Sequence, residues 1–172
     1  IIAESASLVP GRFVSQTQSY GPEARGGNCV SEVVISDQEI DYPRALSLDI
    51  LLALSQRACD RNLPDMKPEG LVIADSDLVE KLLWEKVVKI PFTRIARERL
   101  HREQVANIVA LGALSQFCPW LSVASLKVAI REKVPQGTLA LNWAAFGEGR
   151  RFAYRLKKRR GFEGAKEEDM EI

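Results

Sequence analysis

Two apolar runs, each followed by a segment with helical spacing, constrain the fold more than any other feature. Residues 46–54 read LSLDILLAL, and residues 71–79 read LVIADSDLV. Such runs are typical of strands buried on both faces of a sheet, which is how parallel sheets are packed. Strands that alternate with helices favour a parallel sheet with helical crossovers. We therefore expect an α/β fold with a mostly parallel sheet.

The rest of the chain predicts further elements around these two. Strands are expected at residues 12–18, 29–36 and 85–92, and helices at residues 1–9, 55–66, 93–117, 122–134 and 136–158. Ser55 is the expected N-cap of the helix at 55–66. The first helix resembles the second half of a longer one, so the chain is expected to begin inside a domain.

Charge and length predict one domain with a distinct end. Residues 1–149 are the expected domain, and residues 150–172 the charged C-terminal tail. The run RRFAYRLKKRR begins this tail and is followed by mostly acidic residues. The basic run could touch an acidic surface of a partner, although a solvated terminal helix is the commoner meaning of such a run.

Composition excludes several classes of function. Hydrophobic residues make up 46% of the chain, charged residues 27%, and the formal net charge is +1, so charge favours neither nucleic acid nor a membrane as a partner. No apolar run reaches the length of a membrane span, which is about 20 residues, and no signal peptide is recognised. The three cysteines, Cys29, Cys59 and Cys118, show no CxxC spacing, which argues against a disulfide framework or a metal site and suits the cytoplasm.

Catalytic patterns are missing, so we expect no catalytic residue and no metal ligand in this chain. His101 is the only histidine and is expected to face solvent on a helix. There is no GxSxG motif, no indicated Cys–His pair, and no GxGxxG or GxxxxGK[ST] phosphate-binding loop. The short glycine segments at 112–114 and 147–149 lie in helical contexts and are weak signals.

Asp75 and Asp77 lie where the second apolar run ends. Because strand carboxyl ends face the ligand crevice of an open α/β sheet, these carboxylates could hold a ribose hydroxyl or a metal-bound phosphate. The preferred interpretation is that they cap a helix or close a turn. The three tryptophans, Trp84, Trp120 and Trp143, are expected to pack in the core or at an interface.

An unusual loop, SYGPEARGG, fills residues 19–27 between two strand-like runs. Its glycines and proline permit a tight turn and close backbone approach, and Arg25 offers a planar fork to a carboxylate or phosphate. It could be only a structural corner with an internal Glu–Arg pair. It has more conformational constraints than a corner needs, so we expect it to face a partner. The residues of this candidate site are Ser19, Tyr20, Gly21, Pro22, Glu23, Arg25, Gly26 and Gly27.

This loop, followed at once by SEVVISD, resembles the gamma subunit of 2-oxoacid:ferredoxin oxidoreductases. The segments LDILLALSQRA, PEGLVIADSDLV, IPFTRIARE, NIVALGAL and VPQGTLALNWAAFGEG agree with later elements of that family, in the same order. The loop and strand look more like the 2-oxoglutarate enzymes than the pyruvate enzymes. One departure is that the first strand and GxGGQG-type loop, which open the family's domain, are absent.

The resemblance implies a Rossmann-like layered fold and a non-catalytic role. The complex would decarboxylate a 2-oxoacid oxidatively with coenzyme A as co-substrate and pass electrons to ferredoxin. Thiamine diphosphate, magnesium and iron–sulfur clusters would be held by alpha and beta subunits, with a delta subunit as a further candidate partner. The candidate loop would face these subunits or the coenzyme A path. The alternatives are a free-standing nucleotide- or coenzyme A-binding module and an interaction protein that works through its basic tail.

Overall fold

The computed structural model of this 172-residue chain describes residues 1–20 and 29–160. The strands are β1 (Phe13–Tyr20), β2 (Cys29–Ser36), β3 (Leu48–Ala53), β4 (Met66–Asp75) and β5 (Val87–Ile90). The helices are α1 (Ile2–Ser7), α2 (Gln56–Asn62), α3 (Phe92–Leu100), α4 (Ala106–Leu114), α5 (Val123–Lys133) and α6 (Leu139–Arg160). Short 3₁₀ turns occupy Leu63–Asp65, Glu103–Val105 and Gln136–Thr138.

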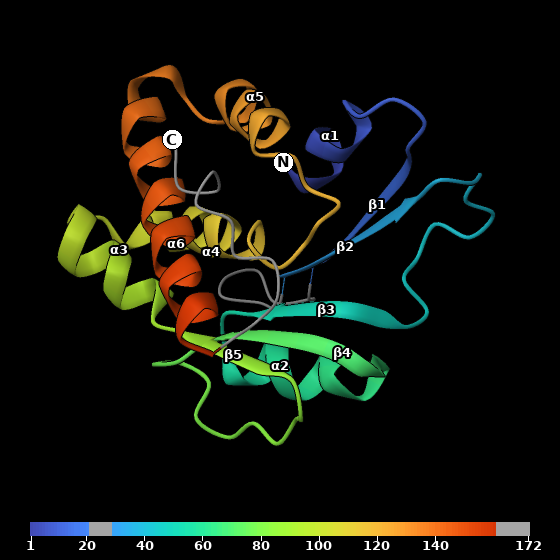
Figure 1. The fold of residues 1–172 in the computed structure, drawn as a ribbon, viewed down its shortest axis with the longest axis horizontal. Coiled ribbons are helices and arrows are strands. Elements are labelled where there is room, and N and C mark those ends of the chain that lie inside the picture. The colour runs from blue at the N-terminus through green and yellow to red at the C-terminus, as the bar shows by residue number, and fades with distance from the viewer. Residues whose placement is uncertain (21–28, 161–172) are drawn as a thin grey trace.

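A parallel sheet with the order β3-β4-β5 forms the centre of the fold. Helix α2 lies on one face of this sheet, and α3, α4 and α6 lie on the other (Figure 1). Successive residues of β4 face opposite sides of the sheet. Val72 and Ala74 pack with Cys59 of α2, whereas Ile73 packs with Phe92 and Val109 on the other side. The predicted α/β class and the parallel sheet are confirmed.

Strands β1 and β2 form a separate antiparallel hairpin. The register runs without interruption from Phe13 opposite Ser36 to Tyr20 opposite Cys29. Both strands were expected from the sequence, but they form a two-stranded sheet of their own instead of widening the parallel one. Their half-exposed residues explain this, because a parallel strand inside the sheet would be apolar on both faces.

The single long helix predicted at 93–117 is wrong. Helix α3 ends at Leu100, His101 adopts a left-handed conformation with φ 52°, and α4 begins only at Ala106. A left-handed residue cannot continue a right-handed helix. Apolar spacing continues on both sides of the break, so periodicity alone does not reveal it. His101 is exposed, as expected.

The helix predicted at 55–66 is shorter than expected. Ser55 is its N-cap, and its Oγ accepts a hydrogen bond of 3.2 Å from the Ala58 N–H, as predicted. The helix ends at Asn62, and β4 already begins at Met66. Residues 67–70 belong to β4, where the register with β3 shifts and accommodates Pro68.

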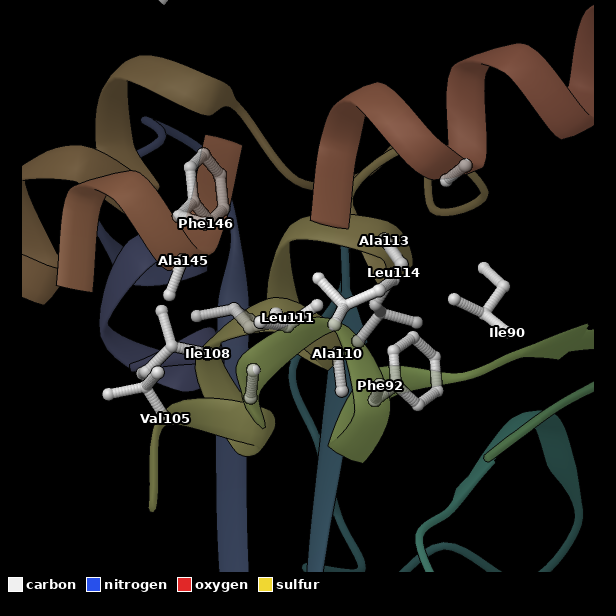
Figure 2. Close-up of a cluster of buried hydrophobic side chains, with 14 of the residues drawn as sticks. Ile90, Phe92, Val105, Ile108, Ala110, Leu111, Ala113, Leu114, Ala145 and Phe146 are labelled. Atoms are coloured by element: carbon white, nitrogen blue, oxygen red, sulfur yellow. The ribbon is translucent and has the colours of Figure 1, made fainter. Parts of the chain in front are cut away.

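The core on the α3, α4 and α6 side depends on close contact between α4 and α6. Figure 2 shows Phe146 and Ala145 of α6 beside Ile108 and Leu111 of α4. A Cβ atom on Gly112 would overlap the Phe146 carbonyl oxygen, and one on Gly149 would overlap the Val109 carbonyl oxygen. The glycine segments 112–114 and 147–149 therefore let two helix backbones approach each other.

Helix α6 extends well beyond the family-like segment recognised in the sequence. It continues to Arg160, so the proposed division after residue 149 falls inside it. Arg150 is 3% exposed, and its Nη1 donates a 3.0 Å hydrogen bond to the Ser115 Oγ. Ala153 and Tyr154 are also buried. The first turn of the basic run is thus part of the folded core.

The same helix is tied to α3 by an ion-pair network. Glu148 Oε2 lies 2.7 Å from Arg99 Nη1, and Glu148 Oε1 lies 2.5 Å from Arg151 Nη2. Burial by itself raises the pKa of Glu148, but the hydrogen bonds from both arginines outweigh it, and the pKa is lowered.

Within residues 1–20 and 29–160, no helix has the length and apolar character needed to cross a membrane.

Candidate partner-facing site

The predicted loop joins the two paired ends of the hairpin. Ser19 lies opposite Val30, and Tyr20 opposite Cys29. Tyr20 is 71% exposed, and its hydroxyl donates a 2.7 Å hydrogen bond to Gln18 Oε1. Both Ser19 and Tyr20 are therefore presented at the surface. The other predicted site residues, Gly21, Pro22, Glu23, Arg25, Gly26 and Gly27, lie outside the described residues.

Polar contacts brace this hairpin. The Thr17 hydroxyl donates to Glu32 Oε2 at 3.1 Å across the two strands, and Arg44 Nη2 donates to Glu32 Oε1 at 3.4 Å. The hydrogen bond from Arg44 lowers the pKa of Glu32, against the opposing effect of desolvation. The Ser15 hydroxyl donates to the Pro43 carbonyl at 3.0 Å. The hairpin is thereby attached to the chain that leads into β3.

The carboxyl edge of the parallel sheet is the other place where a ligand would be sought. Asp75 is fully buried there. Its Oδ2 accepts from the Thr93 N–H at 2.9 Å and from the Thr93 hydroxyl at 2.8 Å, and its Oδ1 accepts from the Asp77 N–H at 2.9 Å. Asp75 thus closes the turn after β4 and caps the first turn of α3. The preferred cap-and-turn interpretation is confirmed.

Asp77 is more exposed and makes weaker contacts. Its Oδ1 accepts from the Ser76 hydroxyl at 3.1 Å, and its Oδ2 lies 3.4 Å from Arg94 Nε.

Among residues 1–20 and 29–160, no group of three or more histidine, cysteine or acidic side chains is arranged to hold a metal ion.

The cysteines differ in their surroundings. Cys59 and Cys118 are at least partly buried, and desolvation is the main reason why the pKa of each thiol is raised. Raising this pKa disfavours the thiolate, which is the reactive form. Cys29 is exposed at the closed end of the hairpin, opposite Tyr20.

The tryptophans divide between core and surface. Trp84 is part-buried against the α2 layer, and its indole N–H donates to the Gly70 carbonyl at 2.8 Å. Trp143 is 39% exposed, and Trp120 is 46% exposed beneath the guanidinium of Arg12, whose Cζ lies 4.0 Å from the ring centroid. Sequence reading missed the Arg12–Trp120 pair because the two residues are far apart in the chain and no local pattern connects them.

The C-terminal residues that carry the family resemblance have structural roles. The Asn142 amide donates to the Thr138 carbonyl at 2.9 Å, and the Thr138 hydroxyl donates to the Pro135 carbonyl at 2.8 Å, which secures the start of α6. Phe146 is 1% exposed, and Gly149 meets Val109. This motif therefore secures the start of α6 and its packing against α4.

Comparison with known proteins gives a consistent result. A model of the family described as pyruvate ferredoxin/flavodoxin oxidoreductase matches residues 1–152. The chain is 46% identical over 160 residues to the 2-oxoglutarate synthase subunit KorC of Methanocaldococcus jannaschii, covering 91% of this chain and 86% of that protein. It is 44% identical to the KorC subunit of Methanothermobacter thermautotrophicus, covering 87% of this chain and 84% of the relative.

Two solved structures of related oxidoreductases are similar to this chain over most of its length. The gamma subunit of a keto/oxoacid ferredoxin oxidoreductase from Geobacter sulfurreducens has a TM-score of 0.76 and 40% identity, over 89% of this chain and 87% of that one. A 2-oxoglutarate:ferredoxin oxidoreductase from Magnetococcus marinus, solved with 2-oxoglutarate, coenzyme A and succinyl-CoA, has a TM-score of 0.76 and 25% identity. That match covers 89% of this chain but 27% of the larger one.

Proposed function

This chain belongs to the pyruvate ferredoxin/flavodoxin oxidoreductase family, and on that premise we propose that it is the gamma subunit of a 2-oxoglutarate:ferredoxin oxidoreductase. The observation that carries the proposal is 46% identity to a 2-oxoglutarate synthase subunit, across nearly the whole of both chains. The expected preference for 2-oxoglutarate over pyruvate agrees with these relatives.

The proposed complex converts 2-oxoglutarate and coenzyme A into succinyl-CoA and carbon dioxide. The carbon–carbon bond to the carboxylate breaks, a thioester forms, and the electrons released reduce ferredoxin. We assign thiamine diphosphate, magnesium and the iron–sulfur clusters to the alpha and beta subunits, with a delta subunit as a further candidate. The cysteine spacing in this chain supports that division. Its three free cysteines also suit a cytoplasmic location.

The role proposed for this chain is to complete the assembly and to present the hairpin. The exposed Tyr20 and Ser19 place the start of the candidate loop at the surface. The Glu32–Arg44 and Ser15–Pro43 contacts hold the strands that carry it. A braced hairpin loses little conformational freedom when it binds, so it suits a contact with a partner subunit or the path of coenzyme A.

Reconstitution tests this function. We expect this chain, coexpressed with the alpha and beta subunits encoded in the same genome, to co-purify with them. We expect the complex to reduce ferredoxin only when 2-oxoglutarate and coenzyme A are both present, and to act more slowly on pyruvate. Calorimetry with coenzyme A and nucleotides on the lone chain tests the alternative of a free-standing binding module. Failure to co-purify, or a preference for pyruvate, would count against the proposal.

The substitution Arg25→Ala should separate assembly or turnover from folding. We expect the complex to lose at least about tenfold in affinity or in turnover, because truncating one partner of a buried, hydrogen-bonded charge pair in an interface costs about 2–5 kcal/mol. The isolated variant should unfold within about 0.5 kcal/mol of the unmodified chain. Arg61→Ala, an exposed arginine on α2, is the matched control. Normal assembly and normal succinyl-CoA formation by the Arg25 variant would remove the loop from the function.

A further inference from the structure

One face of α6 carries a row of solvent-facing basic side chains near its C-terminal end. The spacing of this row is helical, and its members are Arg151, Arg155, Lys158 and Arg159. We call these four residues the α6 basic stripe. The stripe is about 12 Å long, because each helical residue adds about 1.5 Å. It therefore concentrates four positive charges on a small area of the surface.

Two other basic residues of the same helix point into the molecule instead. Arg150 is 3% exposed, and its Nη1 donates to the Ser115 Oγ at 3.0 Å. Lys157 is part-buried, and its Nζ donates to the Gln116 carbonyl at 2.9 Å. These contacts attach α6 to the end of α4. The basic run seen in the sequence thus consists of an inward structural set and the outward stripe.

The charge of the stripe is poorly compensated by the chain itself. Within residues 1–20 and 29–160, Glu148 is the only acidic side chain that pairs with the stripe, and it divides its two oxygens between Arg151 and Arg99. The other three stripe residues form no salt bridge in that part of the chain. Like charges one helical turn apart repel each other. The helix dipole favours cations only in the last turn, so it does not explain Arg151 and Arg155.

The stripe also lacks an apolar centre. On α6, Trp143 is the only large apolar side chain among the exposed ones, and it lies two turns before the stripe. Phe152 and Leu156 are part-buried and pack against the core. Permanent subunit interfaces are rich in apolar surface, whereas charged patches mainly speed the encounter with an oppositely charged partner. The stripe therefore suits an acidic protein that binds and leaves.

We propose that the α6 basic stripe docks an acidic face of the ferredoxin that accepts electrons from the complex. The inference rests on the proposed function, in which ferredoxin is the protein that must bind and leave in every cycle. The family model ends at residue 152, so three of the four stripe residues lie beyond the shared segment. Because the family's description names both ferredoxin and flavodoxin, a surface that selects one acceptor is expected to differ among its members.

The test compares the double variant Arg155→Gln/Lys158→Gln with the unmodified chain, each in the coexpressed complex. With ferredoxin from the same genome, we expect the KM for ferredoxin to rise at least about fivefold at low salt, because charge steering raises association rates about 10–10³-fold. The kcat at saturating ferredoxin and the KM for 2-oxoglutarate should stay the same. The difference should disappear at about 1 M salt, where the Debye length is about 3 Å.

A matched control removes two positive charges elsewhere. Arg61→Gln/Arg131→Gln changes exposed residues of α2 and α5 that form no salt bridge in the described part of the chain. Helix α2 lies on the opposite face of the parallel sheet from α6 (Figure 1). This control should leave the KM for ferredoxin unchanged. Methyl viologen, a small cationic acceptor, needs no acidic docking face, so all three complexes should reduce it equally well.

The outcomes separate this inference from the proposed function. If the unmodified complex reduces neither acceptor with 2-oxoglutarate and coenzyme A, both are overturned. If it reduces both acceptors and the stripe variant has the same KM for ferredoxin, or the control pair raises that KM equally, only the inference is overturned. Loss of assembly by the stripe variant would assign the stripe to a permanent subunit. A lower melting temperature of the isolated variant would assign it to contacts within the chain, and either result would also overturn the inference.

Discussion

Alanine at position 149 is expected to destabilise the protein by about 3 kcal/mol, near the upper end of the usual cost of overpacking. The added Cβ atom would overlap the carbonyl oxygen of Val109, which belongs to the backbone of α4 and cannot rotate away as a side chain can. This overlap can be removed only if α4 and α6 move apart, and that movement opens the core around Phe146. A loss of this size is a large share of the roughly 5–15 kcal/mol that stabilises a typical domain.

Urea unfolding of the isolated chain, followed by circular dichroism, measures this effect. Gly112→Ala should behave similarly, because its Cβ atom would overlap the Phe146 carbonyl oxygen from the other helix. Gly137→Ala is the matched control, since no heavy atom lies within 4 Å of a Cβ there and its φ is not positive. Its stability should change by no more than about 0.5 kcal/mol. Equal midpoints for Gly149→Ala and Gly137→Ala would show that the helices are not in close contact.

The sequence predicted those parts of the fold that depend on local pattern. The apolar runs that became β3 and β4 are continuous, and their alternation with helices is enough to indicate a parallel sheet. The N-cap at Ser55 follows from one side chain and the backbone three residues later. The break at His101 does not follow, because it depends on one backbone conformation inside a pattern that stays helical on both sides.

The candidate loop can be recognised by local pattern as well, and its role in contacting a partner stays a prediction. Adjacent glycines, a proline and an arginine in residues 19–27 mark an unusual loop in the sequence alone. The Arg12–Trp120 pair leaves no such mark, since it forms only when α1 packs beside α5. The close glycine contacts of α4 and α6 were equally hidden, because glycine inside a helical pattern has many explanations until the neighbouring helix is placed.

Asp75→Ala is the second substitution for which we expect a large effect, a loss of about 3 kcal/mol. The carboxylate is fully buried and accepts from the Thr93 N–H, the Thr93 hydroxyl and the Asp77 N–H. Alanine would leave these donors without an acceptor, and each unsatisfied buried donor costs about 1–3 kcal/mol. Partial access of water to the Asp77 N–H keeps the sum below the full total. Urea unfolding of the isolated chain again provides the measurement.

Asp77→Ala provides the contrast that distinguishes a structural carboxylate from a ligand-binding one. Asp77 lies two residues away at the same sheet edge, but its side chain is 36% exposed and its Arg94 contact is 3.4 Å long. Such a surface pair contributes about 0–1 kcal/mol, so this variant should unfold near the unmodified midpoint. If both carboxylates held a ligand instead, Asp75→Ala would keep the stability of the isolated chain and change only ligand binding. The cap on α3 predicts instead that Asp75→Ala is clearly less stable than Asp77→Ala. Thr93, which Asp75 binds, lies at the point where β5 passes into the helix that carries the core residues Phe92 and Ile95.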